Sequence, residues 1–121
     1  MKISNLNMNS YLKTLHKLSD KVSGKLAYCV ARNIRKIGNE LIEFENIRNN
    51  YILEHGKLDS DGNHYIEIGS DEYVKFAEFI NEFMNIEHDV DIMMVDKEDL
   101  FNTTLNANEI LELDFMIKEE T

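Results

Sequence analysis

The sequence predicts a mainly α-helical fold with a minor β element (α+β), made of a long central helix, a small antiparallel hairpin or sheet, and C-terminal helices. Three observations lead to this prediction. Apolar residues recur at spacings of three and four over most of the chain, proline is absent, and strict apolar alternation is confined to one stretch near residue 90. Because 121 residues is an ordinary size for one domain, we expect residues 1–121 to form a single domain.

The first half of the chain predicts two helices separated by a short break. Met8, Leu12 and Leu15 indicate a helix that reaches about residue 19. Residues 19–24 interrupt the pattern, and Ser23 is a suitable N-cap for the next helix. We expect that second helix over residues 25–54, where the apolar positions at helical spacing are Leu26, Val30, Ile34, Ile37, Leu41, Phe44 and Ile47.

The length of the second helix has a consequence for assembly. Thirty residues of helix span about 45 Å, more than the width of a small domain. We therefore expect a homo-oligomer in which a partner covers part of the helix, with a hairpin to the C-terminal helices as the alternative. Gly38 lies in the middle of the helix and marks a candidate bend or close helix crossing.

The second half predicts a hairpin followed by a helix. Gly56 is the expected stop of the long helix, and Asp61-Gly62 between short apolar runs is typical of a hairpin turn. Ser70 is the expected N-cap of a helix over residues 71–85. We expect its buried face to consist of Tyr73, Phe76, Ala77, Ile80 and Met84. Phe79 and Phe83 widen this face, so we expect other elements to cover the helix on two sides.

A strand and a last helix are expected to complete the chain. Residues 86–95 alternate apolar with acidic side chains, which predicts a half-buried strand that could pair with the hairpin. Asn106 and Glu109 have the spacing of a capping box. They open a helix that carries Ile110, Leu113 and Ile117.

Charge divides the chain into two unlike halves. Residues 1–50 hold nine basic and four acidic side chains, and residues 51–121 hold four and 19, so the halves carry +5 and −15 and the whole chain −10. Either the halves neutralise each other or they form interaction surfaces. Closely spaced carboxylates could imitate nucleic-acid phosphates and block a basic groove, and the candidates are Glu87, Asp89, Asp91, Glu98 and Asp99. Long nucleic acid itself is an unfavourable partner for a chain of charge −10.

The basic half contains the candidate ligand-binding site. The free N–H groups that open a helix can bind an anion, and basic side chains cluster around the break that precedes the second helix. The pattern is typical of a site for a phosphate-bearing small molecule such as a nucleotide, with a solvated basic face as the alternative. The candidate residues are Lys17, Lys21, Lys25, Arg32 and Arg35, with Tyr28 placed to lie beside a base or ribose.

No pattern predicts catalysis or a metal site. Cys29 lacks a paired base, and the four histidines lack the i, i+4 spacing of a helical metal pair. The segment beginning at Asp59 departs from a calcium loop at His64 and Ser70. We therefore expect no enzymatic activity, no metal and no cofactor. With one cysteine, no membrane-length apolar run and no signal-peptide pattern, we expect a cytoplasmic protein.

Two stretches carry a family resemblance. They are residues 21–37 (KVSGKLAYCVARNIRKI) and residues 90–100 (VDIMMVDKEDL), the latter followed by LDFMI at residues 113–117. The sequence resembles an uncharacterised family of short acidic proteins from phages and prophages of low-GC Gram-positive bacteria. The family offers no catalytic residues to transfer.

The resemblance implies a phage accessory protein. Proteins of this type often bind and disable host defence components, or serve in virion assembly. We therefore expect an antagonist of a bacterial defence system, which either sequesters a nucleotide signal in the basic segment or blocks an effector with its acidic face. A structural or tail-assembly accessory protein is the alternative.

Overall fold

The structure is a computed structural model and describes residues 1–119. It is mainly helical with a minor β element, as the sequence predicts. The elements follow the order β1 (Lys2–Ser4), α1 (Asn5–Leu18), α2 (Gly24–Glu40), α3 (Ile42–His55), β2 (Lys57–Leu58), β3 (His64–Tyr65), α4 (Asp71–Met84), β4 (Glu87–Asp89) and α5 (Ala107–Glu112). Short 3-10 turns cover Ser19–Lys21, Lys97–Leu100 and Asp114–Met116.

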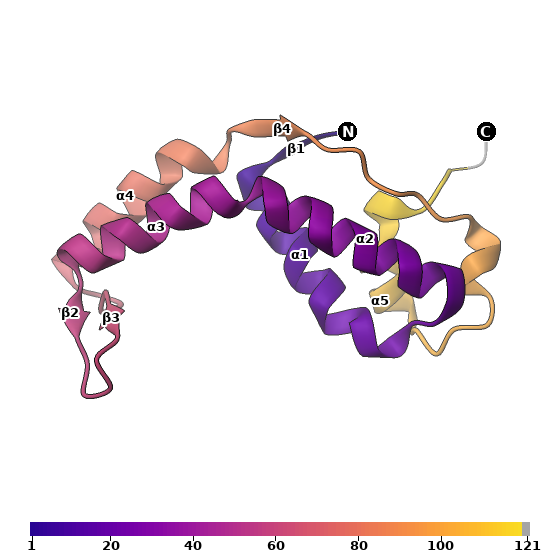
Figure 1. The fold of residues 1–121 in the computed structure, drawn as a ribbon, viewed down its shortest axis with the longest axis horizontal. Coiled ribbons are helices and arrows are strands. Elements are labelled where there is room, and N and C mark those ends of the chain that lie inside the picture. The colour runs from indigo at the N-terminus through magenta and orange to yellow at the C-terminus, as the bar shows by residue number, and fades with distance from the viewer. Residues whose placement is uncertain (120–121) are drawn as a thin grey trace.

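The elements fall into two regions, which Figure 1 shows side by side. We call residues 42–85 the arm, which comprises α3, the β2–β3 hairpin and α4. The remaining described residues form the body. In the arm, α3 and α4 run antiparallel away from the body, and the hairpin lies at the far tip (Figure 1).

The hydrophobic core lies almost entirely in the body. Helix α1 packs against α2, and the segment that contains α5 closes the core from the other side. The fully buried aliphatic and methionine side chains come from all three parts: Met8, Leu15, Leu18, Leu26, Val30, Ile37, Leu41, Val95, Leu113 and Met116. In the arm only Phe44 and Ile80 are buried.

The expected helix over residues 25–54 is two helices, and this part of the prediction is wrong. The break falls at Leu41, whose ψ of −7° departs from helical values although its N–H still bonds Ile37 O at 3.1 Å. Gly38, the expected bend, lies inside α2. The apolar stripe is covered within the chain, since α2 packs on α1 and α3 packs on α4. The length of the stripe therefore no longer requires a second copy.

The strand near residue 90 pairs with a different partner from the one expected. β4 is antiparallel to β1, with Ile3 opposite His88, and it does not join the hairpin. The sequence pattern gave no indication of β1, which is only three residues long. The ladder on β4 ends at Asp89, and residues 90–96 continue as an extended segment along the body.

Most of the local signals at the helix ends and the hairpin are confirmed. Ser70 Oγ accepts from the Tyr73 N–H at 3.1 Å, and Asn106 and Glu109 form the predicted capping box. Ser23 is the N-cap residue of α2 but makes no side-chain capping bond. Helix α5 ends at Glu112, so Leu113 and Ile117 lie beyond the helix that was expected to carry them. The hairpin turns at Gly62, which has a φ of 84°. Among the helices of residues 1–119, none has the length and apolar character needed to cross a membrane.

Candidate functional site

The three lysines of the predicted basic site all face carboxylates from the C-terminal part of the chain. Lys17 Nζ lies 2.8 Å from Glu112 Oε2, and Lys21 Nζ lies 2.6 Å from Glu109 Oε2. The partners are 88 to 95 residues away in the sequence. These two ion pairs thus join α5 to α1 and to the turn that follows α1.

Glu109 is the buried member of this set of ion pairs. Its side chain is 8% exposed, and its Oε1 accepts from the Asn106 backbone N–H at 3.0 Å. The hydrogen bond from Lys21 holds the pKa of Glu109 below its ordinary value, and the Asn106 N–H acts in the same direction. A buried carboxylate needs such partners to remain ionised. The ion pair with Lys21 therefore keeps the buried Glu109 ionised and links α5 to the turn at residues 19–21.

Two carboxylates of the same chain also lie close to the start of α2. Lys25 Nζ lies 3.5 Å from carboxylate oxygens of both Asp96 and Asp99. These carboxylates raise the pKa of Lys25 above its ordinary value, with Asp99 the larger cause. Gly24 has a φ of 61°, a backbone conformation that favours glycine. The helix start that the sequence assigned to a phosphate faces two carboxylates of the same chain.

The other three predicted site residues lie on one face of α2. Tyr28, Arg32 and Arg35 follow at spacings of four and three, so they share a side of the helix. Tyr28 is 60% exposed, and Arg35 is also exposed. Arg32 is half-buried, and its Nε is buried with no hydrogen-bond partner among the described residues. These three remain available, while the three lysines are paired.

Cys29 is a core residue. It is 2% exposed, and burial raises the pKa of its thiol above the ordinary value. The thiol is therefore held in its protonated form, which is a poor nucleophile.

Asn33 is the buried polar residue that sequence reasoning missed. Its side chain is fully buried, with Nδ2 donating to Met93 O at 3.0 Å and Oδ1 accepting from Met93 N–H at 2.8 Å. This paired bond fixes the extended segment 90–96 against α2. The sequence did contain a signal for this burial. Asn33 lies four residues after Cys29 and four before Ile37, so its amide shares the apolar face of the helix.

The predicted buried stripe of α4 is only partly covered, contrary to expectation. Ile80 is buried and Phe76 and Met84 are half-buried, whereas Tyr73 is 38% exposed and Ala77 is exposed as well. The contact with α3 uses a neighbouring face, where Phe79 stacks on Tyr51 with ring centroids 4.5 Å apart. The helix is thus covered on one side rather than two.

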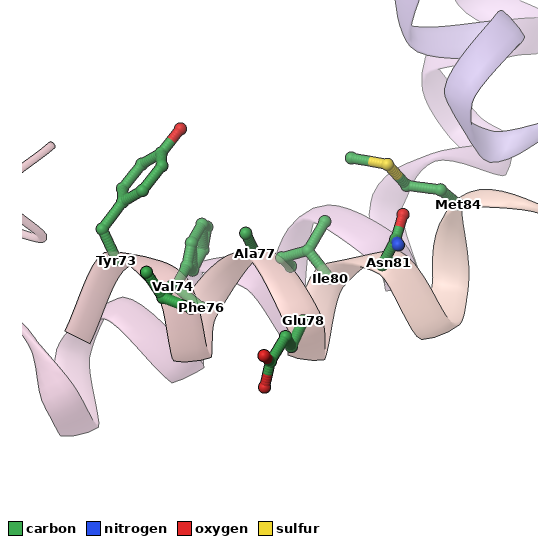
Figure 2. A pocket seen from close by; sticks show the side chains of 8 residues that line it. All are labelled: Tyr73, Val74, Phe76, Ala77, Glu78, Ile80, Asn81 and Met84. Atoms are coloured by element: carbon green, nitrogen blue, oxygen red, sulfur yellow. The ribbon is translucent and has the colours of Figure 1, made fainter. Parts of the chain in front are cut away.

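The open side of α4 forms an apolar groove of about 480 Å³. Figure 2 shows Tyr73, Ala77 and Met84 along one side of the helix, with Glu78 directed away from them. Exposed apolar surface of this kind marks interaction sites in soluble proteins. We call this surface the α4 groove, which is lined by Tyr73, Val74, Phe76, Ala77, Glu78, Ile80, Asn81 and Met84.

The acidic side chains divide between the two regions. Of the five expected to imitate phosphates, Asp89, Asp91 and Asp99 pair with the N-terminal amine, Lys36 and Lys25. The arm differs, with ten acidic and three basic side chains and a net charge of −7. Glu87 and Glu98 are exposed in the body, and the larger share of the net negative charge lies on the arm.

The described residues contain no group of three or more histidine, cysteine, aspartate or glutamate side chains placed to hold a metal ion. Comparison with protein-family models, with curated proteins and with solved structures found no match to the chain.

Proposed function

We propose that this chain is a non-catalytic binding protein of the phage accessory type, which antagonises a bacterial defence system in the host cytoplasm. It acts by docking its arm against a defence protein. The phage context comes from the family resemblance of residues 21–37, 90–100 and 113–117. The choice of a protein partner comes from the surface of the arm.

The α4 groove is the observation that carries the proposal. Of its apolar side chains, Tyr73, Val74 and Ala77 are exposed on the isolated chain, although the adjacent face of the same helix packs on α3. Burying apolar surface contributes about 25 cal/mol per Å² to association, so a partner that covers the groove gains stability. Tyrosine, phenylalanine and methionine, which line the groove, are also the residue types enriched in protein interfaces.

The charge of the arm selects the chemistry of the partner. With a net charge of −7, the arm attracts a surface that carries lysine or arginine around an apolar segment. A second copy of this chain would bring two arms of the same sign together. A basic host protein is therefore the occupant we assign to the α4 groove.

The experiment is expression of the protein in Gram-positive hosts that each carry one known defence system, followed by plaque counts of a restricted phage. The wild-type protein is expected to restore plaques in at least one host. Ala77→Arg places a long charged side chain in the α4 groove and is expected to abolish the restoration.

Ala31→Arg is the matched control, because Ala31 is an exposed alanine on a helix of the body. It is expected to restore plaques as the wild type does. Failure of the wild type in every host, or equal activity of Ala77→Arg, would contradict the proposal. Light scattering of the purified proteins tests the other occupant: a wild-type dimer that Ala77→Arg converts to monomer would assign the α4 groove to a second copy.

Nucleotide sequestration is the second candidate, and one observation favours it. Arg32 Nε is buried without a hydrogen-bond partner, on the face that also carries Tyr28 and Arg35. Calorimetric titration with cyclic and linear nucleotides tests this candidate on the wild type and on Arg32→Ala. Heat that Arg32→Ala removes would support it, and the absence of heat from any nucleotide would end it.

A further inference from the structure

A small cavity of about 130 Å³ lies at the elbow where the arm joins the body. Its polar lining comes from four elements, because Asn5 begins α1, Glu40 ends α2, Glu43 lies in the first turn of α3, and His88 lies in β4. Its apolar walls include Phe44 and Phe83. We call it the elbow pocket.

Asn5 leaves an unused acceptor in the wall of the elbow pocket. The residue is 4% exposed, and its Oδ1 has no hydrogen-bond partner among the described residues. Its Nδ2 donates to Phe83 O at 2.9 Å. Turning the amide over would lose that bond, so Oδ1 stays in place as an acceptor without a donor. Buried acceptors in native proteins are normally paired, which points to a missing donor.

The other polar groups of the elbow pocket favour a donor with a positive charge. Two carboxylates, Glu40 and Glu43, line the pocket, and neither lysine nor arginine does. Glu40 Oε2 lies 3.5 Å from His88 Nδ1, which leaves its second oxygen free of that contact. Hydrogen bonds between a cationic donor and a carboxylate are stronger than neutral ones. The apolar walls suit the methylene stem that carries such a cation.

We propose that the elbow pocket receives the cationic end of a lysine or arginine side chain from the bound partner. The inference rests on the proposed function, whose partner is a basic protein. Both features use the last turn of α4, where Phe83 lines the elbow pocket and Met84 lines the α4 groove. The partner that covers the groove is therefore the source we assign to the basic side chain.

The test uses a capped lysine, Nα-acetyl-lysine methylamide, titrated into the ¹⁵N-labelled protein. The side-chain amide of Asn5 and the backbone amide of Ile86 report on the elbow pocket. Both resonances are expected to shift saturably with capped lysine, and to stay in place with capped norleucine, which has the same stem without the charge. A polyamine, spermidine, is titrated in parallel.

Substitutions separate the elbow pocket from general charge effects. Glu43→Gln is expected to raise the dissociation constant of capped lysine about tenfold, which corresponds to about 1.4 kcal/mol of binding free energy. Glu54→Gln removes the same charge from the same helix outside the pocket, and it is expected to leave the constant unchanged.

Three results would overturn the assignment. Equal shifts with norleucine would show that the stem binds without its charge, and the absence of a saturable shift would show that the elbow pocket does not bind the cation. Much tighter binding of spermidine than of capped lysine would assign the pocket to a free polyamine. The plaque assay with Ala77→Arg does not depend on this titration. A negative titration would therefore overturn the elbow-pocket assignment without overturning the proposed function, and a negative plaque assay would overturn the proposed function without a change in the titration.

Discussion

The body and the arm use their charged residues in different ways. In the body, Lys17, Lys21 and Lys25 pair with carboxylates from distant parts of the chain. In the arm, the described ion pairs join near neighbours, such as Lys75 with Glu72 at i,i+3, and the region keeps a net charge of −7. Four of the nine basic side chains of residues 1–50, those of Lys17, Lys21, Lys25 and Lys36, thus pair with carboxylates of the acidic half. Most of the net negative charge and the α4 groove lie on the arm, which is the region that we propose meets a partner.

The largest expected contrast lies at the border of the two regions. Leu41 is fully buried in the body core, whereas Ile42, the next residue, is 47% exposed. Leu41→Ala is expected to lower the free energy of unfolding by about 2–5 kcal/mol. Ile42→Ala is expected to change it by less than about 0.5 kcal/mol. Urea denaturation of both variants measures the difference, and equal effects would contradict the border between body and arm.

The next contrast is between a buried and an exposed amide on α2. Asn33→Ala leaves the N–H and C=O of Met93 unpaired, which costs about 1–3 kcal/mol for each fully buried group. Because Met93 is half-buried, we expect a total loss of about 2–4 kcal/mol. Asn39 is exposed, and Asn39→Ala is the matched control, with an expected change below about 0.5 kcal/mol. The same denaturation assay applies. A loss for Asn33→Ala no greater than for Asn39→Ala would show that segment 90–96 is held by other contacts.

Acid titration separates the ion pairs of the body from those of the arm. Because the folded protein lowers the pKa of Glu109, the pair with Lys21 stabilises the fold above the unfolded-state value of about 4.3 and is lost as the pH falls through the folded-state pKa. Glu109→Gln is therefore expected to flatten the fall in stability below about pH 4.3. Glu72→Gln, which removes the exposed arm pair, is expected to keep the wild-type slope. Urea denaturation from pH 7 to pH 3 checks both, and a steeper slope for Glu109→Gln would refute the assignment.

The smallest expected effect is a gain in the body. Gly38 lies inside α2, and a Cβ added there would meet no atom within 4 Å. Gly38→Ala is expected to stabilise the protein by about 0.5–1 kcal/mol, because glycine loses more backbone freedom than alanine in a helix. Thermal unfolding measures the gain. A loss of stability would mean that α2 makes a close contact at this position.

Local features of the fold followed from the sequence, and long-range ones did not. Ser70, Asn106 and the Asp61-Gly62 turn act through neighbours within a few residues, so their roles were predictable. The break at Leu41 was missed because the apolar spacing of three and four continues across it. The strand β1 was missed because three residues acquire strand structure only by pairing with residues 87–89.

The candidate site was harder to predict than the fold, for the same physical reason. Lys17, Lys21 and Lys25 were correctly placed around one helix break, but their partners at residues 96–112 come from another part of the chain. The buried face of α4 was misassigned because its apolar residues spread over more than one side of the helix. Sequence spacing cannot say which side meets α3 and which stays open.

The pairing of β1 with β4 affects the order in which the chain can fold during its synthesis. Lys2 stands opposite Asp89, so the strand made first waits for one made almost ninety residues later. Until residues 86–117 have left the ribosome, α1 and α2 lack both the segment that closes their core and the carboxylates that pair with their lysines. The contacts within the arm, between α3, the hairpin and α4, have no such delay, because contacts between nearby residues form early. The arm also contacts α1 and α2, which are made before it. Until the segment of residues 86–117 is made, the nascent chain therefore exposes the lysine side chains of α1 and α2 that this segment later pairs.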